Sequence, residues 1–192
     1  MGREFELKFR ATPARQNAIL KEFGDFSTIS METTYYDTPS RSLSAQGITL
    51  RQRLENGISV CTLKTPGTGY SRGEWNVEEA EIAAAIPELC KLSGVVELKN
   101  WAQEGLYPLC SARFTRQRKN LSLPDFTAEL ALDSGVLLGA GREMPLCELE
   151  LELISGSENA LVDYAEKLAA QYGLEPESDS KFRRAMALAT GE

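Results

Sequence analysis

The most constraining feature of this chain is an alternation of charged and apolar residues that recurs along most of its length. Near the N-terminus Glu4, Glu6 and Lys8 alternate with Phe and Leu, and between residues 148 and 152 glutamates alternate with leucines. Successive side chains of a β-strand point to opposite faces, so a period of two places all these charges on one face. The pattern predicts strands with one apolar face and one face that carries charges of both signs.

This alternation predicts roughly eight strands that form a mainly antiparallel sheet. Asn56-Gly57, Pro66-Gly67 and Ser134-Gly135 are residue pairs typical of turns, and each lies between two alternating runs. The predicted strands span residues 4–10, 33–36, 48–54, 58–64, 72–78, 114–118, 127–133 and 146–154.

Helix end signals are clear at two places. Thr12 predicts the start of a helix that ends at Gly24, and Ser157 predicts the start of one that ends at Gly173. A shorter helix is predicted close to the C-terminus, and residues 78–104 are predicted to be mixed and mainly helical. This combination indicates an α+β fold, and the chain length indicates a single domain over residues 1–192.

Composition excludes several classes of function. The chain has 28 acidic and 21 basic residues and no His, so its net charge is −7. Without His it can hold no Ser-His-Asp or Cys-His site, and the acidic balance argues against nucleic acid as a partner.

Its cysteines are far apart, as is typical of free thiols in a reducing cytosol. With no secretory signal and no long apolar run, we expect a cytoplasmic protein without a membrane partner.

The charged face has two interpretations. An antiparallel sheet often has one face in water, and for any single strand this explains the charges. Across all the strands, exposure to water explains the charges less well. Several glutamates in a row, or Arg51 and Arg53 on one face, repel each other without counter-charges. The alternative is a barrel of roughly eight strands, with apolar faces outward under helices and charged faces lining a tunnel.

The side chains of such a lining indicate its ligand. Clustered carboxylates without His or Cys favour hard cations such as Mg²⁺ or Mn²⁺. Clustered Arg and Lys favour phosphate oxygens, which Arg binds bidentately. Both together predict a complex of a metal ion with a short polyphosphate, because the lumen of so small a barrel is narrow.

Ordered motifs across nearly the whole chain match the pattern of one family. Glu4-x-Glu6-x-Lys8 resembles the E-x-E-x-K signature of the CYTH superfamily, the triphosphate tunnel metalloenzymes. That signature alone is weak, but the ordered set is specific. The other matching elements are Tyr35-Tyr36-Asp37-Thr38-Pro39, Leu50-Arg51-x-Arg53, Thr62-Leu63-Lys64, Arg72-x-Glu74, Arg116, Ala131-Leu132-Asp133-x-Gly135, the run from Cys147 to Leu153, and Ser180-Lys181 with Arg184.

Within the superfamily, the stretches at residues 71–76 and 147–156 look most like the N-terminal domain of bacterial inorganic triphosphatases. In those proteins a helical CHAD domain usually follows, so a C-terminal CHAD domain in a longer parent chain is an expectation. The resemblance implies an eight-stranded antiparallel tunnel with helices packed outside. It also implies a Mg²⁺ or Mn²⁺ cofactor and hydrolysis of a small-molecule triphosphate, inorganic tripolyphosphate, to pyrophosphate and phosphate.

The resemblance further implies residue roles. Glu4, Glu6 and Lys8 are the implied catalytic residues, with the attacking water held between the metal and Glu4 or Glu6. The implied metal ligands are Glu4, Glu6, Asp133, Glu148, Glu150 and Glu152. The implied substrate ligands are Lys8, Arg51, Arg53, Lys64, Arg72, Arg116, Arg118, Lys181 and Arg184.

Three other functions fit the same resemblance or lining. A thiamine triphosphatase needs an apolar or aromatic mouth, which the sequence does not locate. A class IV adenylyl cyclase needs a purine site, and the glutamate-rich run at 148–152 disfavours it. A non-catalytic polyphosphate-binding module needs bases more than paired acids, so Glu4-x-Glu6-x-Lys8 disfavours it.

Overall fold

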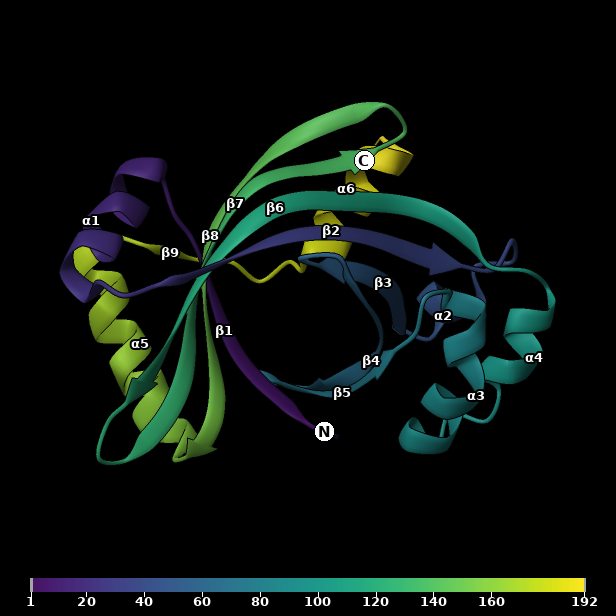
Figure 1. Cartoon of the computed structure of the whole chain (residues 1–192), viewed down its shortest axis with the longest axis horizontal. Helices are drawn as coiled ribbons and strands as arrows, with labels where there is room; N and C mark the ends of the chain where they lie inside the picture. The colour runs from purple at the N-terminus through teal and green to yellow at the C-terminus, as the bar shows by residue number, and fades with distance from the viewer. Residues whose placement is uncertain (1, 192) are drawn as a thin grey trace.

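The computed structural model describes residues 2–191, in which eight antiparallel strands close into a barrel (Figure 1). The strands follow the order β5-β4-β3-β2-β6-β7-β8-β1, and the pairing of β5 with β1 closes the ring. A short ninth strand pairs with β1. The strands are β1 (Glu4–Arg10), β2 (Ser27–Asp37), β3 (Thr49–Glu55), β4 (Ile58–Thr68), β5 (Ser71–Glu78), β6 (Tyr107–Ser122), β7 (Phe126–Gly139), β8 (Arg142–Gly156) and β9 (Glu175–Pro176).

The predicted α+β barrel is confirmed, but most strands are longer than predicted. β6 covers residues 107–122 rather than 114–118, because it pairs along its length with both β2 and β7. Ser134-Gly135 forms no turn and lies inside β7, so that prediction was wrong. A Cβ at Gly135 would lie 2.2 Å from the carbonyl oxygen of Arg113, so close strand contact requires glycine there. Pro66-Gly67 likewise lies within β4, where its register with β5 shifts.

α1 and α5 begin at the predicted caps Thr12 and Ser157, and the short helix predicted near the C-terminus begins after Ser180. The hydroxyls of Thr12, Ser157 and Ser180 each accept a hydrogen bond from a backbone N–H in the first helical turn. The helices are α1 (Pro13–Phe23), α2 (Ser42–Ala45), α3 (Ile82–Ser93), α4 (Leu98–Gln103), α5 (Glu158–Tyr172) and α6 (Lys181–Thr190). None of the helices within residues 2–191 is long and apolar enough to cross a membrane.

Two groups of helices cover the outside of the barrel and appear on opposite sides of it in Figure 1. α1 and α5 pack on outward-facing leucines of β7 and β8, among them Leu130 and Leu149. α2, α3 and α4 pack on outward-facing residues of β3 and β4, among them Leu50 and Leu63. Burial of these apolar faces leaves the opposite, charged faces of the same strands pointing inward.

α6 packs on the inner face instead. Its Phe182 ring lies 5.2 Å from the ring of Tyr35, and α6 shares a core cluster with Phe114, which has the same strand face as Arg116. A Cβ at Gly139 in β7 would lie 2.5 Å from a carbonyl oxygen of α6, so glycine permits this close approach. The first turn of α6 therefore reaches the charged interior.

Candidate active site

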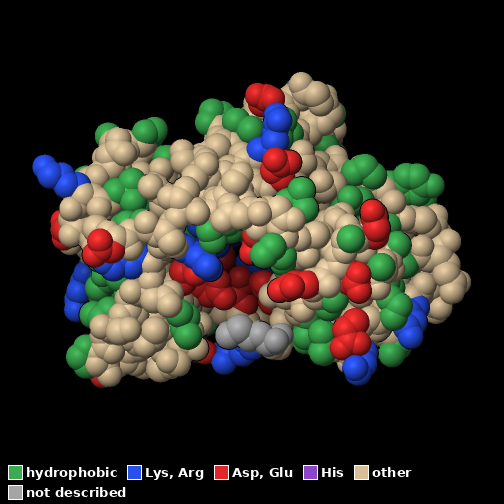
Figure 2. All heavy atoms as spheres, viewed as in Figure 1, with side chains coloured by type: hydrophobic (Ala, Val, Ile, Leu, Met, Phe, Trp, Pro, Cys, Tyr) green, Lys and Arg blue, Asp and Glu red, His purple; other side chains and the backbone are tan. Residues whose placement is uncertain are grey.

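The inward strand faces enclose a cavity of about 330 Å³ lined mainly by charged and polar side chains. Figure 2 shows acidic side chains gathered in a central hollow, with basic side chains beside them. Of the predicted site residues, Asp133, Glu148 and Arg184 do not line this cavity. The predicted residues that line it are Glu4, Glu6, Lys8, Arg51, Arg53, Lys64, Arg72, Arg116, Arg118, Glu150, Glu152 and Lys181.

Strand register brings charges of opposite sign together. Where β1 meets β5, Glu4 lies opposite Arg72, and on the neighbouring pair of strands Lys64 lies opposite Glu74. Directly opposed residues on one face have Cβ atoms about 4.5–5.5 Å apart, which is within reach of an ion pair. The closure of the barrel therefore assembles charges that are far apart in the sequence.

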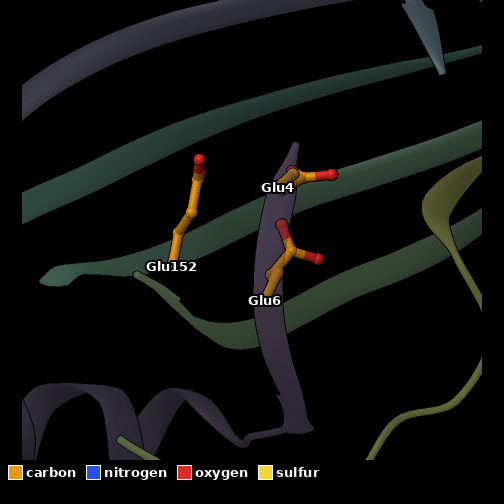
Figure 3. Close-up of side chains that lie close together, drawn as sticks. All are labelled: Glu4, Glu6 and Glu152. Atoms are coloured by element: carbon orange, nitrogen blue, oxygen red, sulfur yellow. The ribbon is translucent and has the colours of Figure 1, made fainter. Parts of the chain in front are cut away.

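Three of the carboxylates form a first carboxylate group. Glu4 and Glu6 project from β1 and Glu152 from the adjacent β8 (Figure 3), and one oxygen of each lies within 4.8 Å of the others. Glu4 accepts hydrogen bonds from Lys64 at 3.0 and 3.1 Å. Glu6 lies 3.5 Å from Arg72, and Glu152 makes no ion pair within the described residues 2–191. Arg72 also pairs with Glu4, and Lys8 lies 3.9 Å from Glu6, so the unbalanced negative charge of this group lies at Glu152.

Proton affinities in the first carboxylate group reflect that imbalance. Burial, with the nearby carboxylates of Glu150 and Glu4, raises the pKa of Glu6 to about 7. Burial, with the carboxylates of Glu4 and Glu6, raises the pKa of Glu152 to about 8. Desolvation and like charges both disfavour an ionised carboxyl, and a cation bound between these groups would relieve both effects.

On β3 the excess charge is positive, because two arginines there are incompletely paired with carboxylates. Arg53 is only 5% exposed, and its ion pair with Glu55 spans 4.0 Å. The Nε atom of Arg51 is buried without a hydrogen-bond partner in the described structure. Burial, with the positive charges of Arg51 and Arg116, lowers the pKa of Arg53 to about 10. An anion placed between Arg51 and Arg53 would satisfy both guanidinium groups.

A second carboxylate group, Asp133, Glu148 and Glu150, is balanced by cations. The ammonium of Lys181 lies 2.8 Å from Asp133 Oδ2 and 2.7 Å from Glu150 Oε1, and it also pairs with Glu148. Despite the opposing effect of burial, Lys181 and Arg116 hold the pKa values of Asp133 and Glu150 below their usual range. Burial raises the pKa of Glu148 even beside these cations.

Comparison with known proteins agrees with this geometry. The model of the CYTH domain matches residues 2–186. The chain belongs to the CYTH family. The inorganic triphosphatase of Haemophilus influenzae is 29% identical to this CYTH chain over 197 residues, covering 98% of the chain and 55% of the relative. The chain therefore spans about half the length of the curated relative that it matches.

Solved structures share the fold of this CYTH chain at identities that inform on fold alone. A candidate adenylate cyclase from Bacillus halodurans gives a TM-score of 0.67 at 20% identity, covering 96% of this chain and 98% of that one. PH1819 from Pyrococcus horikoshii gives a TM-score of 0.63 at 22% identity, covering 94% of this chain and 97% of that one. The Hippeastrum protein HpAC1, whose dominant activity is that of a triphosphatase, gives 0.66 at 18% identity, covering 100% and 97%.

The two carboxylate groups of this CYTH domain differ in how well they suit a divalent cation. The first group offers oxygen ligands, which hard cations prefer, and its negative charge is incompletely balanced. In the second group Lys181 already lies among the same oxygens that a metal would need. The first group therefore fits a metal ion, and the second does not.

Some tunnel residues escaped the predicted site although the alternation places them on the charged face. Glu74 holds Lys64 at 2.6 Å, which keeps the pKa of the Glu74 carboxyl well below its usual range against the effect of burial. Thr33 accepts a hydrogen bond of 2.9 Å from Arg53 Nε. Glu129 pairs with Arg118 at 3.2 Å. Each of these residues binds a basic side chain of the cavity, a contact between strands that spacing along the chain does not reveal.

Proposed function

We propose that this CYTH domain hydrolyses inorganic tripolyphosphate to pyrophosphate and phosphate with Mg²⁺ or Mn²⁺ as its cofactor. The observation that carries this proposal is that one cavity holds carboxylates short of cations and arginines short of anions. A metal–polyphosphate complex supplies both missing charges at once. The triphosphatase name of the Haemophilus influenzae relative supports the choice of reaction.

The substrate is bound mainly by basic residues whose positive charges lack a close carboxylate partner. Arg51 and Arg53 hold phosphate oxygens with charge-assisted hydrogen bonds from the β3 side of the cavity. Arg118 extends this basic surface toward its exposed end, since nearly half of its side chain is in solvent. Lys64 and Arg72 bind Glu4, so they orient that carboxylate and contribute positive charge close to the phosphates.

Glu4, Glu6 and Glu152 would hold the divalent ion, which supplies neutralisation of charge on the phosphoryl oxygens and activation of water. The attacking water forms a new P–O bond while the anhydride bond to pyrophosphate breaks. A carboxylate oxygen of Glu6, which lines the cavity beside Glu4, accepts the proton of that water. Lys8, 3.9 Å from Glu6, helps to orient this carboxylate.

The test measures phosphate release from tripolyphosphate, ATP and thiamine triphosphate with Mg²⁺ or Mn²⁺, and again with EDTA. We expect tripolyphosphate to be hydrolysed fastest, EDTA to abolish turnover, and Glu6→Gln to lose turnover while retaining substrate binding. Glu78→Gln, at the exposed end of β5, is the matched control and should leave the rate unchanged. Full activity of the Glu6→Gln variant would contradict its assigned role.

The same assay separates the other functions of this fold. Formation of cyclic AMP from ATP would replace the proposal with an adenylyl cyclase. A clear preference for thiamine triphosphate would identify an organic triphosphate as the substrate. Tight binding of tripolyphosphate without turnover under either metal would favour a binding module.

A further inference from the structure

The second carboxylate group is a set of deeply buried acids that the family resemblance assigns to a metal, yet a lysine fills it. Asp133 and Glu148 are fully buried and Glu150 is 6% exposed. The ammonium of Lys181 contacts all three, at 2.8 Å from Asp133 Oδ2 and 2.7 Å from Glu150 Oε1, and in a close pair with Glu148. Lys181 therefore occupies the centre of the group.

Two guanidinium groups complete the balance of charge. Arg116 donates to both oxygens of Asp133, at 2.8 and 2.7 Å, and also pairs with Glu150. Arg184 pairs with Glu148. All three carboxylates thus have cationic partners, and Lys181 alone contacts all of them, so a divalent ion entering this desolvated site would have to displace its ammonium.

The position of Lys181 is set by the packing of α6. Lys181 is the first residue of that helix, directly after the Ser180 cap, and its ammonium lies 5.2 Å from the ring centre of Phe114. Phe182 anchors the same turn on Tyr35. Lys181 is only 6% exposed and is fixed by this packing. Its ammonium is therefore placed to neutralise the surrounding carboxylates and not to move with a bound phosphate group.

We propose that Lys181 is a built-in counter-ion, which fills the second carboxylate group in place of a divalent metal. Lys181 is accordingly a positioning residue: it fixes Glu150, which lies opposite Lys8 on the neighbouring strand and lines the cavity. Without substrate, divalent cations bind only at Glu4, Glu6 and Glu152, the metal site on which the proposed function rests.

The test counts Mn²⁺ ions bound per chain, without substrate, by titration calorimetry and by electron paramagnetic resonance of free Mn²⁺. Lys181→Gln vacates the centre of the group and leaves a net negative charge, so we expect one more Mn²⁺ per chain than in the wild type. Arg183→Gln, at the exposed neighbouring position on α6, is the matched control and should bind as the wild type does. Equal Mn²⁺ counts for Lys181→Gln and the wild type would overturn the proposal.

A second measurement uses substitutions in the presence of the native lysine, in case Lys181→Gln does not fold. Glu148→Gln should leave the Mn²⁺ count of the protein unchanged, whereas Glu152→Gln should lower it. Loss of a bound Mn²⁺ in Glu148→Gln would show that metal enters the second group despite Lys181 and would overturn the inference. The difference in count between Lys181→Gln and the wild type is independent of activity, so it stands even if no triphosphate is hydrolysed.

Discussion

Charge balance differs from residue to residue within the tunnel, although only a few side-chain types line it. Within residues 2–191, the carboxylate nearest to Arg53 is that of Glu55 at 4.0 Å, whereas Arg116 forms close pairs with Asp133 and Glu150. The two arginines belong to the same face of the barrel and yet have different roles. One is available to an anion, and the other maintains a buried network.

Methionine substitutions should separate these two roles. Arg53→Met removes charge-assisted hydrogen bonds worth about 1.5–3 kcal/mol, so we expect KM for tripolyphosphate to rise roughly tenfold or more with little loss of stability. Arg116→Met leaves buried carboxylates without their partner, and we expect it to cost roughly 3–5 kcal/mol of unfolding free energy. Steady-state kinetics and urea denaturation measure both effects. Equal losses of stability in the two variants would contradict this division.

The raised pKa values of Glu6 and Glu152 predict how stability depends on pH. In the folded protein these carboxyls titrate at about 7 and about 8, against 4.5 ordinarily, so the folded state binds their protons more tightly. Their contribution is therefore full below pH 4.5 and is lost as the pH rises through about 8. In EDTA the unfolding free energy should fall across this window by several kcal/mol at most, since each unit by which a pKa is raised corresponds to about 1.4 kcal/mol. Glu152→Gln should flatten that decline, and an unchanged slope would count against the raised pKa.

At the scale of elements, part of the family motif serves the scaffold. Asp37 is the last residue of β2 and is fully buried. Its Oδ1 accepts hydrogen bonds from the backbone N–H groups of Thr38 and Leu43, and its Oδ2 accepts from the N–H and hydroxyl of Ser44. The Tyr-Tyr-Asp-Thr-Pro stretch thus joins β2 to α2, which packs beneath β3.

Asp37→Ala should therefore act on stability and not on substrate binding. Leaving several buried N–H groups unsatisfied costs about 1–3 kcal/mol for each group that water cannot reach, so we expect a loss of at least about 2 kcal/mol. KM should change little, because Asp37 does not line the cavity. Asp163→Ala, at an exposed position on α5, is the control for thermal unfolding. A large rise in KM without loss of stability would reverse this assignment.

At the scale of the whole molecule, the barrel is closed by a short contact. β1 and β5 pair through only two residue positions within the described chain, aided by a hydrogen bond of 3.0 Å from Glu6 N to the carbonyl of Tyr70. Arg72 of β5 pairs with Glu4 and Glu6 of β1 across this seam. Because the first carboxylate group lies at the same seam, binding there should stabilise the closed barrel.

Divalent metal should accordingly raise global stability. At about a hundredfold excess over its dissociation constant, Mn²⁺ should add about 2.7 kcal/mol to the unfolding free energy. EDTA should remove this gain, and Glu152→Gln should reduce it, because Glu152 supplies one of the grouped oxygens. Urea denaturation with and without Mn²⁺ measures the change. Undiminished stabilisation of Glu152→Gln would indicate that the metal binds elsewhere.

The fold was predictable to the extent that a period of two is a local property. Each of the eight strands was found from its alternation, since that pattern depends only on neighbouring residues. The ends of the strands were not found in this way, because β6 and β7 are extended by pairing with residues remote in the sequence. The turn predicted at Ser134-Gly135 was wrong for the same reason. This residue pair is typical of a turn, but here the adjacent strand β6 approaches closely and requires the glycine.

The sequence by itself determined that one face of the strands carries charges of both signs and that the opposite face is apolar. Only the tertiary structure decided which of these charges are balanced. Lys181 lies far along the chain from Asp133 and Glu148, and only the docking of α6 on the inner face brings its ammonium among them. Coulomb interactions depend on distance in space and on burial, and both are set by closure and packing, so spacing along the chain cannot encode them directly.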